Sequence, residues 1–208
     1  MRSPSLPGRI PSTAARRSVY NARLMNLKLP RSYKLLLSLA LVAGPFIWLV
    51  MTEDGQRRSD LFVLHLLGQP SFNIAFQRLS DAVTETEIAR DFPHVAFQCE
   101  DRTTTFGNRV CVARIASINE LPARSARFDY ADGHLSAARL DYRARYHDLL
   151  VTSLRNGLGE PLAPVGGDVL IWRLPGGVLM LAAKRPQNPK DAAMMWLSPE
   201  LATQHGAG

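Results

Sequence analysis

The chain contains little cysteine and none of the common catalytic signatures. Of its 208 residues only two are cysteines, Cys99 and Cys111, and their spacing does not match the CxxC pattern of redox and zinc sites. The sequence also lacks the HExxH, GxSxG and P-loop motifs, so metalloprotease, serine hydrolase and nucleotide-binding functions gain no support. No Asn-x-Ser/Thr acceptor is present, which weakly favours a bacterial envelope protein.

Charge is absent from one long stretch near the N-terminus, which reads LLLSLALVAGPFIWLVM. As a helix, these 17 residues would span about 26 Å, close to the hydrocarbon thickness of a bilayer. The stretch therefore predicts a transmembrane helix from Leu35 to Met51, with Trp48 near the far headgroup region.

Acidic residues are missing from residues 1–34, which carry eight Lys and Arg side chains. Just after the apolar stretch only Arg57 and Arg58 are basic, among acidic neighbours. The positive-inside rule predicts a cytoplasmic N-terminus and a periplasmic C-terminal domain on a bacterial inner membrane. A cleaved signal peptide needs small residues after its core, and this core ends in bulky ones, so we expect an uncleaved single-pass anchor. A buried globular helix is the alternative, and the charge asymmetry argues against it.

The basic tail permits two further interpretations. Its arginine- and serine-rich, acid-free composition, broken by prolines, is also typical of an organelle transit peptide. The protein would then be an organelle inner-membrane assembly factor with a cleaved tail. Translation from Met25 instead of Met1 would leave only a short basic flank.

The net charge of +7 comes from this tail. Residues 35–208 hold 17 basic and 18 acidic side chains, so the exported part has no basic field to attract nucleic acid. We therefore expect the lipid bilayer and a protein as partners, and no nucleic acid, cofactor, metal or small-molecule ligand.

The two cysteines lie in alternating segments, 94–101 and 109–116, separated by a turn-like segment. A hairpin centred on Thr105 places Cys99 directly opposite Cys111. In an oxidising compartment the pair should form a disulfide. A redox or metal pair is the alternative, and neither the spacing nor a neighbouring histidine favours it.

Between the apolar stretch and this hairpin the pattern is helical. Residues 59–67 are apolar enough to lie at the membrane interface or to pack under the domain. Residues 71–92 predict two helical pieces, with Ser80 or Asp81 as the N-cap of the second piece.

After the hairpin, Asp132-Gly133 separates two alternating segments, which predicts a second hairpin with a type I′ turn. An amphipathic helix is expected over residues 143–156, where apolar side chains recur at helical spacing. A third hairpin over 168–185 and a last strand over 191–197 complete the pattern.

The predicted fold is α+β: a single transmembrane helix, then a small two-layer domain. The sheet is made mostly of antiparallel hairpins, with one long amphipathic helix packed on a face. We expect a disordered cytoplasmic tail at residues 1–34, a transmembrane helix at 35–52 and a juxtamembrane helical segment at 53–92. The exported domain follows at 93–198, and a disordered C-terminal tail at 199–208.

Other polar groups are interpreted as structural. None of the histidines forms a metal-ligand motif, and Glu100 and Asp101 are neighbours on a strand, so they point to opposite faces. The Gly-Gly pairs are interpreted as turns, and the Met194–Trp196 segment as core and edge strand. The histidines and glycine pairs are His65, His94, His134, His147, His205, Gly166-Gly167 and Gly176-Gly177.

One surface is a candidate for binding. Arginines interleave with phenylalanines along the predicted hairpins, which would make either a partner-binding sheet face or a solvated one. The residues are Arg102, Arg109, Arg114, Arg124, Arg127, Phe97, Phe106 and Phe128. By elimination we expect a non-enzymatic envelope protein that binds or scaffolds a protein partner, through a sheet face or an edge strand. The alternative is an envelope hydrolase or enzyme subunit with an unrecognised site.

Overall fold

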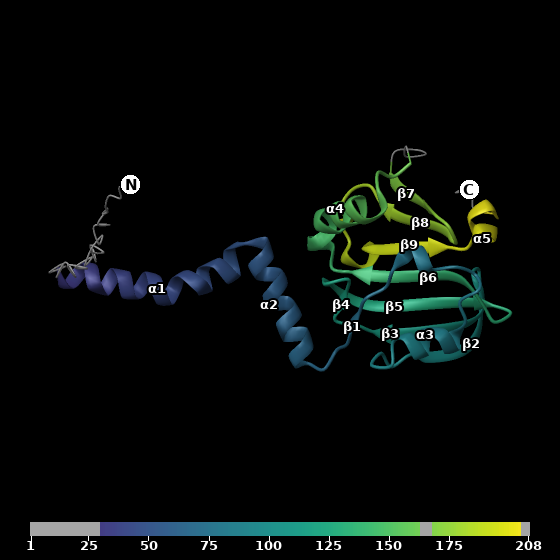
Figure 1. The fold of residues 1–208 in the computed structure, drawn as a ribbon, viewed down its shortest axis with the longest axis horizontal. Helices are drawn as coiled ribbons and strands as arrows, with labels where there is room; N and C mark the ends of the chain where they lie inside the picture. Colours follow the sequence, from purple (N-terminus) through teal and green to yellow (C-terminus); the bar gives the residue numbers. More distant parts are fainter. Residues whose placement is uncertain (1–29, 163–167, 205–208) are drawn as a thin grey trace, which may run out of the picture. The chain divides into compact units, whose positions relative to one another are not determined.

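The computed structural model describes residues 30–162 and 168–204 (Figure 1). The predictions for most of the basic tail, for Gly166-Gly167 and for His205 lie outside this part of the chain. The chain divides into two units, the first ending at Ala43 and the second running from Gly44 to Gly208.

The apolar stretch forms helix α1, Arg31–Met51, which contains the whole of the predicted span. None of its residues is buried. By length and composition α1 can cross a membrane, a property that it shares with signal sequences. Helix α2, Glu53–Leu66, follows after Thr52, whose hydroxyl accepts a hydrogen bond from the Gly55 N–H at 3.0 Å and so caps α2.

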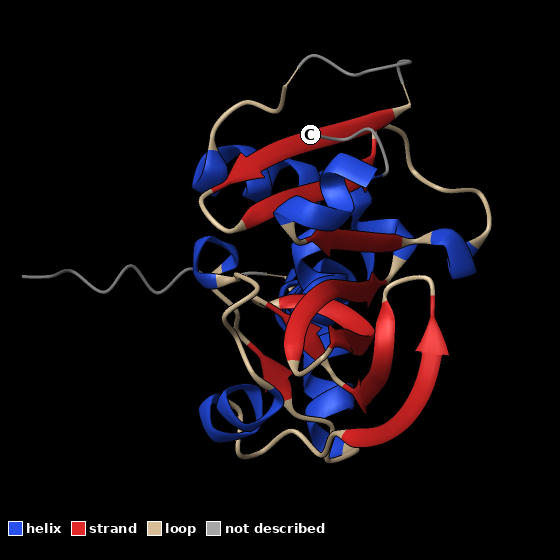
Figure 2. Ribbon diagram, turned by 90° about the vertical axis from the view of Figure 1, so that its right-hand side faces the viewer, coloured by secondary structure: helices blue, strands red, loops and turns tan. Residues whose placement is uncertain are grey.

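Nine strands form the sheet of the second unit (Figure 2). Seven lie side by side and antiparallel in the order β2-β3-β5-β6-β9-β8-β7. The two short strands β4 and β1 continue from the other end of β5, and β1–β4 is the parallel pair. The bounds are β1 Ser71–Phe72, β2 Gln98–Thr104, β3 Gly107–Arg114, β4 Ser117–Ile118, β5 Leu121–Ala131, β6 His134–Tyr142, β7 Val169–Leu174, β8 Gly177–Ala182 and β9 Ala193–Leu197.

All three predicted hairpins are present. Cys99 lies opposite Cys111 in the β2–β3 pair. Asp132 and Gly133 join β5 to β6 with φ angles of 52° and 84°, as a type I′ turn requires. In the third hairpin Leu174 pairs with Gly177.

The main core lies on one face of the sheet, under α3 (Glu85–Asp91), the 3₁₀ turn Phe76–Arg78 and α4 (His147–Leu158). Helix α4 contributes Leu150 and Leu154, which the helical spacing predicted. The mixed α+β fold with an antiparallel sheet is therefore confirmed. Two further 3₁₀ turns, Ala144–Tyr146 and Pro189–Asp191, precede α4 and β9.

The prediction of two helical pieces over residues 71–92 is wrong for the first piece. Ser71 and Phe72 form β1, because Phe72 is fully buried in the core and pairs with Ile118. Long-range packing here overrides local helix preference. The second piece is shorter than expected: Thr84, not Ser80 or Asp81, caps α3, through a capping box with Glu87.

The C-terminal prediction also needs correction. Residues 199–208 were expected to be disordered, but Pro199–Gln204 form helix α5, in which Ala202 is buried. Ala202 packs in a second apolar cluster with Leu197 and Val178, on the other face of the sheet from the main core. The segment around Met194–Trp196 is not an edge strand, since β9 pairs with β6 on one side and β8 on the other.

Candidate functional site

Strand β2 is an open edge of the sheet. It pairs with β3 on one side, and no described residue pairs with its other side. The Cα atoms of Cys99 and Cys111 are 4.0 Å apart, which is typical of a non-hydrogen-bonded antiparallel pair. The N–H and C=O groups of Cys99 therefore point away from β3, and those of Asp101, two residues on, do the same. The edge offers free backbone donors and acceptors.

A disulfide fixes this edge to the sheet. The sulfur atoms of Cys99 and Cys111 are 2.02 Å apart, as the hairpin register predicted. Cys111 is buried in the main core and Cys99 packs against it. The covalent link therefore ties the open strand to a rigid part of the domain.

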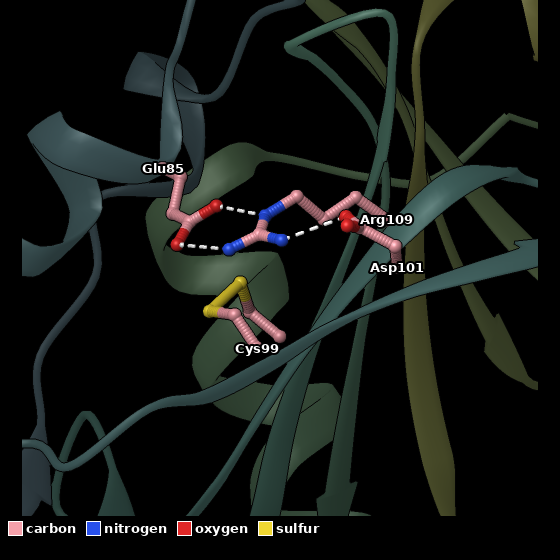
Figure 3. The surroundings of a disulfide bond; sticks show 5 residues. Glu85, Cys99, Asp101 and Arg109 are labelled. Carbon is pink, nitrogen blue, oxygen red and sulfur yellow. Dashed lines mark hydrogen bonds and ion pairs between the residues drawn. A yellow bond between two sulfur atoms is a disulfide. The ribbon is translucent and has the colours of Figure 1, made fainter.

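Beside the disulfide, Arg109 links β2 to the rest of the domain through ion pairs (Figure 3). Its guanidinium donates to both carboxylate oxygens of Glu85 on α3, at 2.5 and 3.1 Å, and to Asp101 on β2 at 2.7 Å. The hydrogen bonds to Glu85 and then to Asp101 raise the pKa of Arg109 above its ordinary value, so it stays charged. One arginine thus joins α3, β3 and the edge strand.

A small pocket of about 150 Å³ lies under this group, lined by Glu85, Tyr130 and both cysteines among others. The hydroxyl of Tyr130 is buried without a hydrogen-bond partner among the described residues. Burial, followed by the charge of Glu85, raises the Tyr130 pKa. Ligand atoms of Glu85, Cys99 and Cys111 lie within 4.8 Å of one another. While the sulfurs are bonded to each other they are not the thiolates that hold metals.

The face of the sheet opposite the main core carries a polar row. Arg127 of β5 lies beside Arg139 of β6, and Met195 of β9 follows. Each arginine is neutralised within its own strand: Arg127 binds Asp129 through two hydrogen bonds, at 2.6 and 2.8 Å, and Arg139 binds Asp141 at 3.0 Å. The charges of both arginines on this face are therefore neutralised by neighbouring carboxylates.

Of the predicted arginine–phenylalanine surface, Arg109 lies on the same side of the sheet as Phe97 and Phe128, where it binds Glu85 and Asp101. Phe128 is fully buried in the main core and Phe97 packs against that core. Arg127 lies on the opposite face, as does Arg102, which pairs with Glu100 at 3.1 Å. Phe106 packs with the smaller cluster, Arg114 is exposed at the end of β3, and Arg124 donates to the backbone of Pro189.

Three of the four described histidines are exposed: His65, His94 and His134. His65 lines an open pocket of about 450 Å³ with Ser71, Ser117 and Glu120. The Ser117 hydroxyl donates to Ser71 at 3.0 Å. No hydrogen bond joins His65 to either serine or to Glu120 in the described part of the chain, so the pocket holds no assembled nucleophile and base.

The fourth, His147, is buried, although its place on the amphipathic helix suggested a helix flank. Its Nδ1 lies 2.7 Å from the Tyr142 hydroxyl. Burial raises the pKa of Tyr142 to about 12, so its hydroxyl is the donor and the imidazole accepts as the neutral form. The contact is internal to the core.

A pH-dependent stability follows from His147. Burial lowers its pKa against the opposing effects of Asp148 and the Ala183 backbone. The unfolded chain then binds more protons than the folded one, so stability falls as the pH drops below about 6.5 and levels off below the folded-state pKa. We expect the melting temperature to fall between about pH 7.5 and pH 5.5. The fall should be smaller in His147→Gln, whereas Thr103→Ala, an exposed change that removes no titratable group, should keep the pH dependence of the parent. Equal pH profiles for His147→Gln and the parent would contradict this.

Comparison with known proteins gives no relative: no family model, no curated protein and no solved structure matches this chain.

The sequence indicated Cys99 and Cys111 but not their surroundings. Glu85 and Arg109 are 24 residues apart and carry no spacing signal. Asp129 lies close in sequence to the Asp132-Gly133 turn, which gives no sign of burial, yet it is buried beside Arg127 and Thr104. The only sequence signal for this buried ion pair is that Arg127 and Asp129 are two residues apart on one strand, which places them on the same face of the sheet.

Proposed function

We propose that this is a membrane-anchored, non-enzymatic envelope protein whose exported domain binds a protein partner. Helix α1 is the single span, the basic tail stays in the cytoplasm, and the domain lies in the bacterial periplasm. This orientation is supported by the eight basic residues before the span, against only Arg57 and Arg58 just after it. An oxidising compartment agrees with the Cys99–Cys111 bridge.

The open edge of β2 is the binding surface, and an extended segment of the partner adds to it as a further strand. The observation that carries this proposal is the row of unpaired backbone groups at Cys99 and Asp101, on a strand fastened by a disulfide and by Arg109. Main-chain hydrogen bonds give affinity in such strand addition.

The side chains of β2 do not block that edge. Edges are commonly protected by charged side chains, proline or bulges. β2 has no proline or lysine, and its charges are paired on the surface, Asp101 with Arg109 and Glu100 with Arg102. Its one irregularity, between Asp101 and Thr104, comes after the free groups of Cys99. The Arg127–Arg139 face is less suited to strand addition, because β5, β6 and β9 each pair with a neighbour on both sides and so offer no open edge there.

A backbone-specific pair of variants tests strand addition. Asp101→Pro removes the outward N–H, whereas Asp101→Asn keeps it and loses the same ion pair with Arg109. With a photo-crosslinking residue at Thr103 of the full chain in native membranes, we expect an adduct to one partner. The adduct should persist in Asp101→Asn and drop by about tenfold in Asp101→Pro.

The same crosslinker at Leu149, an exposed position on α4, is the matched control and should give no such adduct. Both Asp101 variants should show similar melting curves, which separates binding from folding. Equal adduct yields from Asp101→Pro and Asp101→Asn would refute binding through the β2 backbone.

An envelope hydrolase remains the second candidate, with the pocket of His65, Ser71 and Ser117 as its site. It is the weaker proposal because the two serines bond each other and His65 contacts neither. N-terminal sequencing of the mature protein would separate a third possibility, an organelle assembly factor that has lost its tail.

A further inference from the structure

Helix α2 has one face fixed on the domain. Leu64 is buried there. Asp60 accepts hydrogen bonds from the Tyr146 hydroxyl at 2.8 Å and from Arg143 at 3.2 Å, and it also pairs with Arg145. These contacts determine which side of α2 turns outward.

The face of α2 that points away from the domain starts at Gly55, next to the end of α1. Gly55 is buried against the last turn of α1: a Cβ atom there would lie 2.5 Å from the Trp48 carbonyl oxygen and 2.6 Å from the Leu49 Cα. At 100° per residue, Ser59, Phe62 and Leu66 continue the face of Gly55 along the helix. The face of α2 that touches the end of α1 is thus the face that points away from the domain.

This face is apolar and open. Phe62 and Leu66 are 69% and 77% exposed, and Val63 and Leu67 beside them are 51% and 68% exposed. No charged side chain lies among Gly55, Ser59, Phe62 and Leu66. The charged residues of α2 occupy its first turns and the flanks or the domain side: Glu53, Asp54, Arg57, Arg58 and Asp60. A contiguous apolar patch of this kind on the surface of a small domain marks a site that contacts a membrane or another protein.

We propose that this stripe rests on the lipid bilayer, so that α2 is an interfacial helix lying in the headgroup region next to the span. The inference rests on the proposed role of α1 as a membrane anchor. Only Thr52 separates the two helices, and the uncharged face of α2 is the face that contacts the last turn of α1 at Gly55. An apolar face beside charged flanks is the pattern of helices that lie in the interface. Lipid is therefore the occupant, in preference to a protein.

Environment-sensitive labels on single introduced cysteines test this placement. The native pair is in a disulfide, so a new cysteine in the full chain can be labelled selectively. The full chain carrying an NBD label at Phe62→Cys or Leu66→Cys is reconstituted at low density into phosphatidylcholine–phosphatidylglycerol vesicles. Lipids with a doxyl group near the headgroup should quench both labels about threefold more than a label at Arg173→Cys, which is exposed on β7.

A fourth label at Val42→Cys, near the middle of α1, is read with lipids that carry the doxyl group deep in the acyl chain, and it reports on the span itself. Quenching at Val42 without excess quenching at Phe62 and Leu66 would overturn the interfacial placement and leave the anchor intact. No quenching at Val42 would overturn the anchor and this inference together. Quenching at Phe62 and Leu66 with vesicles as the only partner excludes the need for a protein cover.

Discussion

Loss of the disulfide is expected to lower the free energy of unfolding by about 3 kcal/mol. The bridge joins Cys99 and Cys111 across 12 residues, and a closed loop of this size removes about that much conformational entropy from the unfolded chain. The variant Cys99→Ser/Cys111→Ser leaves no free thiol. Its melting temperature, measured on the full chain in mild detergent under oxidising conditions, should fall by about 5 °C or more.

The effect should be concentrated at the sheet edge. β2 is held by β3, the bridge and Arg109, so its amide hydrogens should exchange much faster in the double variant than those of β5 and β6. Thr103→Ala, an exposed change in the same strand, is the matched control and should leave the melting curve unchanged. Equal melting temperatures for the double variant and the parent would show that the bridge adds nothing. Thiols that react with alkylating reagents in intact cells would contradict an oxidising compartment.

Asp129→Asn is expected to destabilise the domain by about 3 kcal/mol, at the lower end of the cost of breaking a buried ion pair. The Asp129 side chain is 2% exposed and accepts two hydrogen bonds from Arg127 and one from Thr104 at 3.1 Å. An amide cannot accept both guanidinium bonds, so the charge of Arg127 loses its partner. The cost stays at the lower end because Arg127, 29% exposed, keeps some contact with water.

Asp132→Asn provides the matched control three residues away. Asp132 sits in the type I′ turn at φ 52°, where asparagine is equally favourable, and its side-chain oxygen can still accept from Asn108. Urea unfolding of the full chain in detergent should give a large shift for Asp129→Asn and almost none for Asp132→Asn. Similar midpoints for these two variants would show that Asp129 acts only as a turn-flanking residue.

The hairpins were predictable because each is specified locally. Asp132-Gly133 demands positive φ angles, and the alternation around Thr105 placed the cysteines opposite each other. The amphipathic helix was recognisable for the same reason, although its first residues, Ala144–Tyr146, form a 3₁₀ turn and α4 starts at His147. In all of these the signal and the structure lie within about 20 residues.

The remaining features depend on contacts between distant segments. Nothing local shows that β9 lies between β6 and β8, or that Phe72 pairs in parallel with Ile118. The ion pair of Glu85 with Arg109, central to the candidate site, likewise joins a helix to a strand through tertiary packing. Periodicity reports which face of an element is buried and does not report its neighbour.

The position of β9 sets the timing of folding. β9 completes the middle of the sheet, between a hairpin made earlier in the chain and one made just before it. Until residues 193–197 have been synthesised, the two halves of the sheet have no strand to join them. The sheet therefore closes late, and before that β6 and β8 each present an unpaired edge that other chains or proteases can reach.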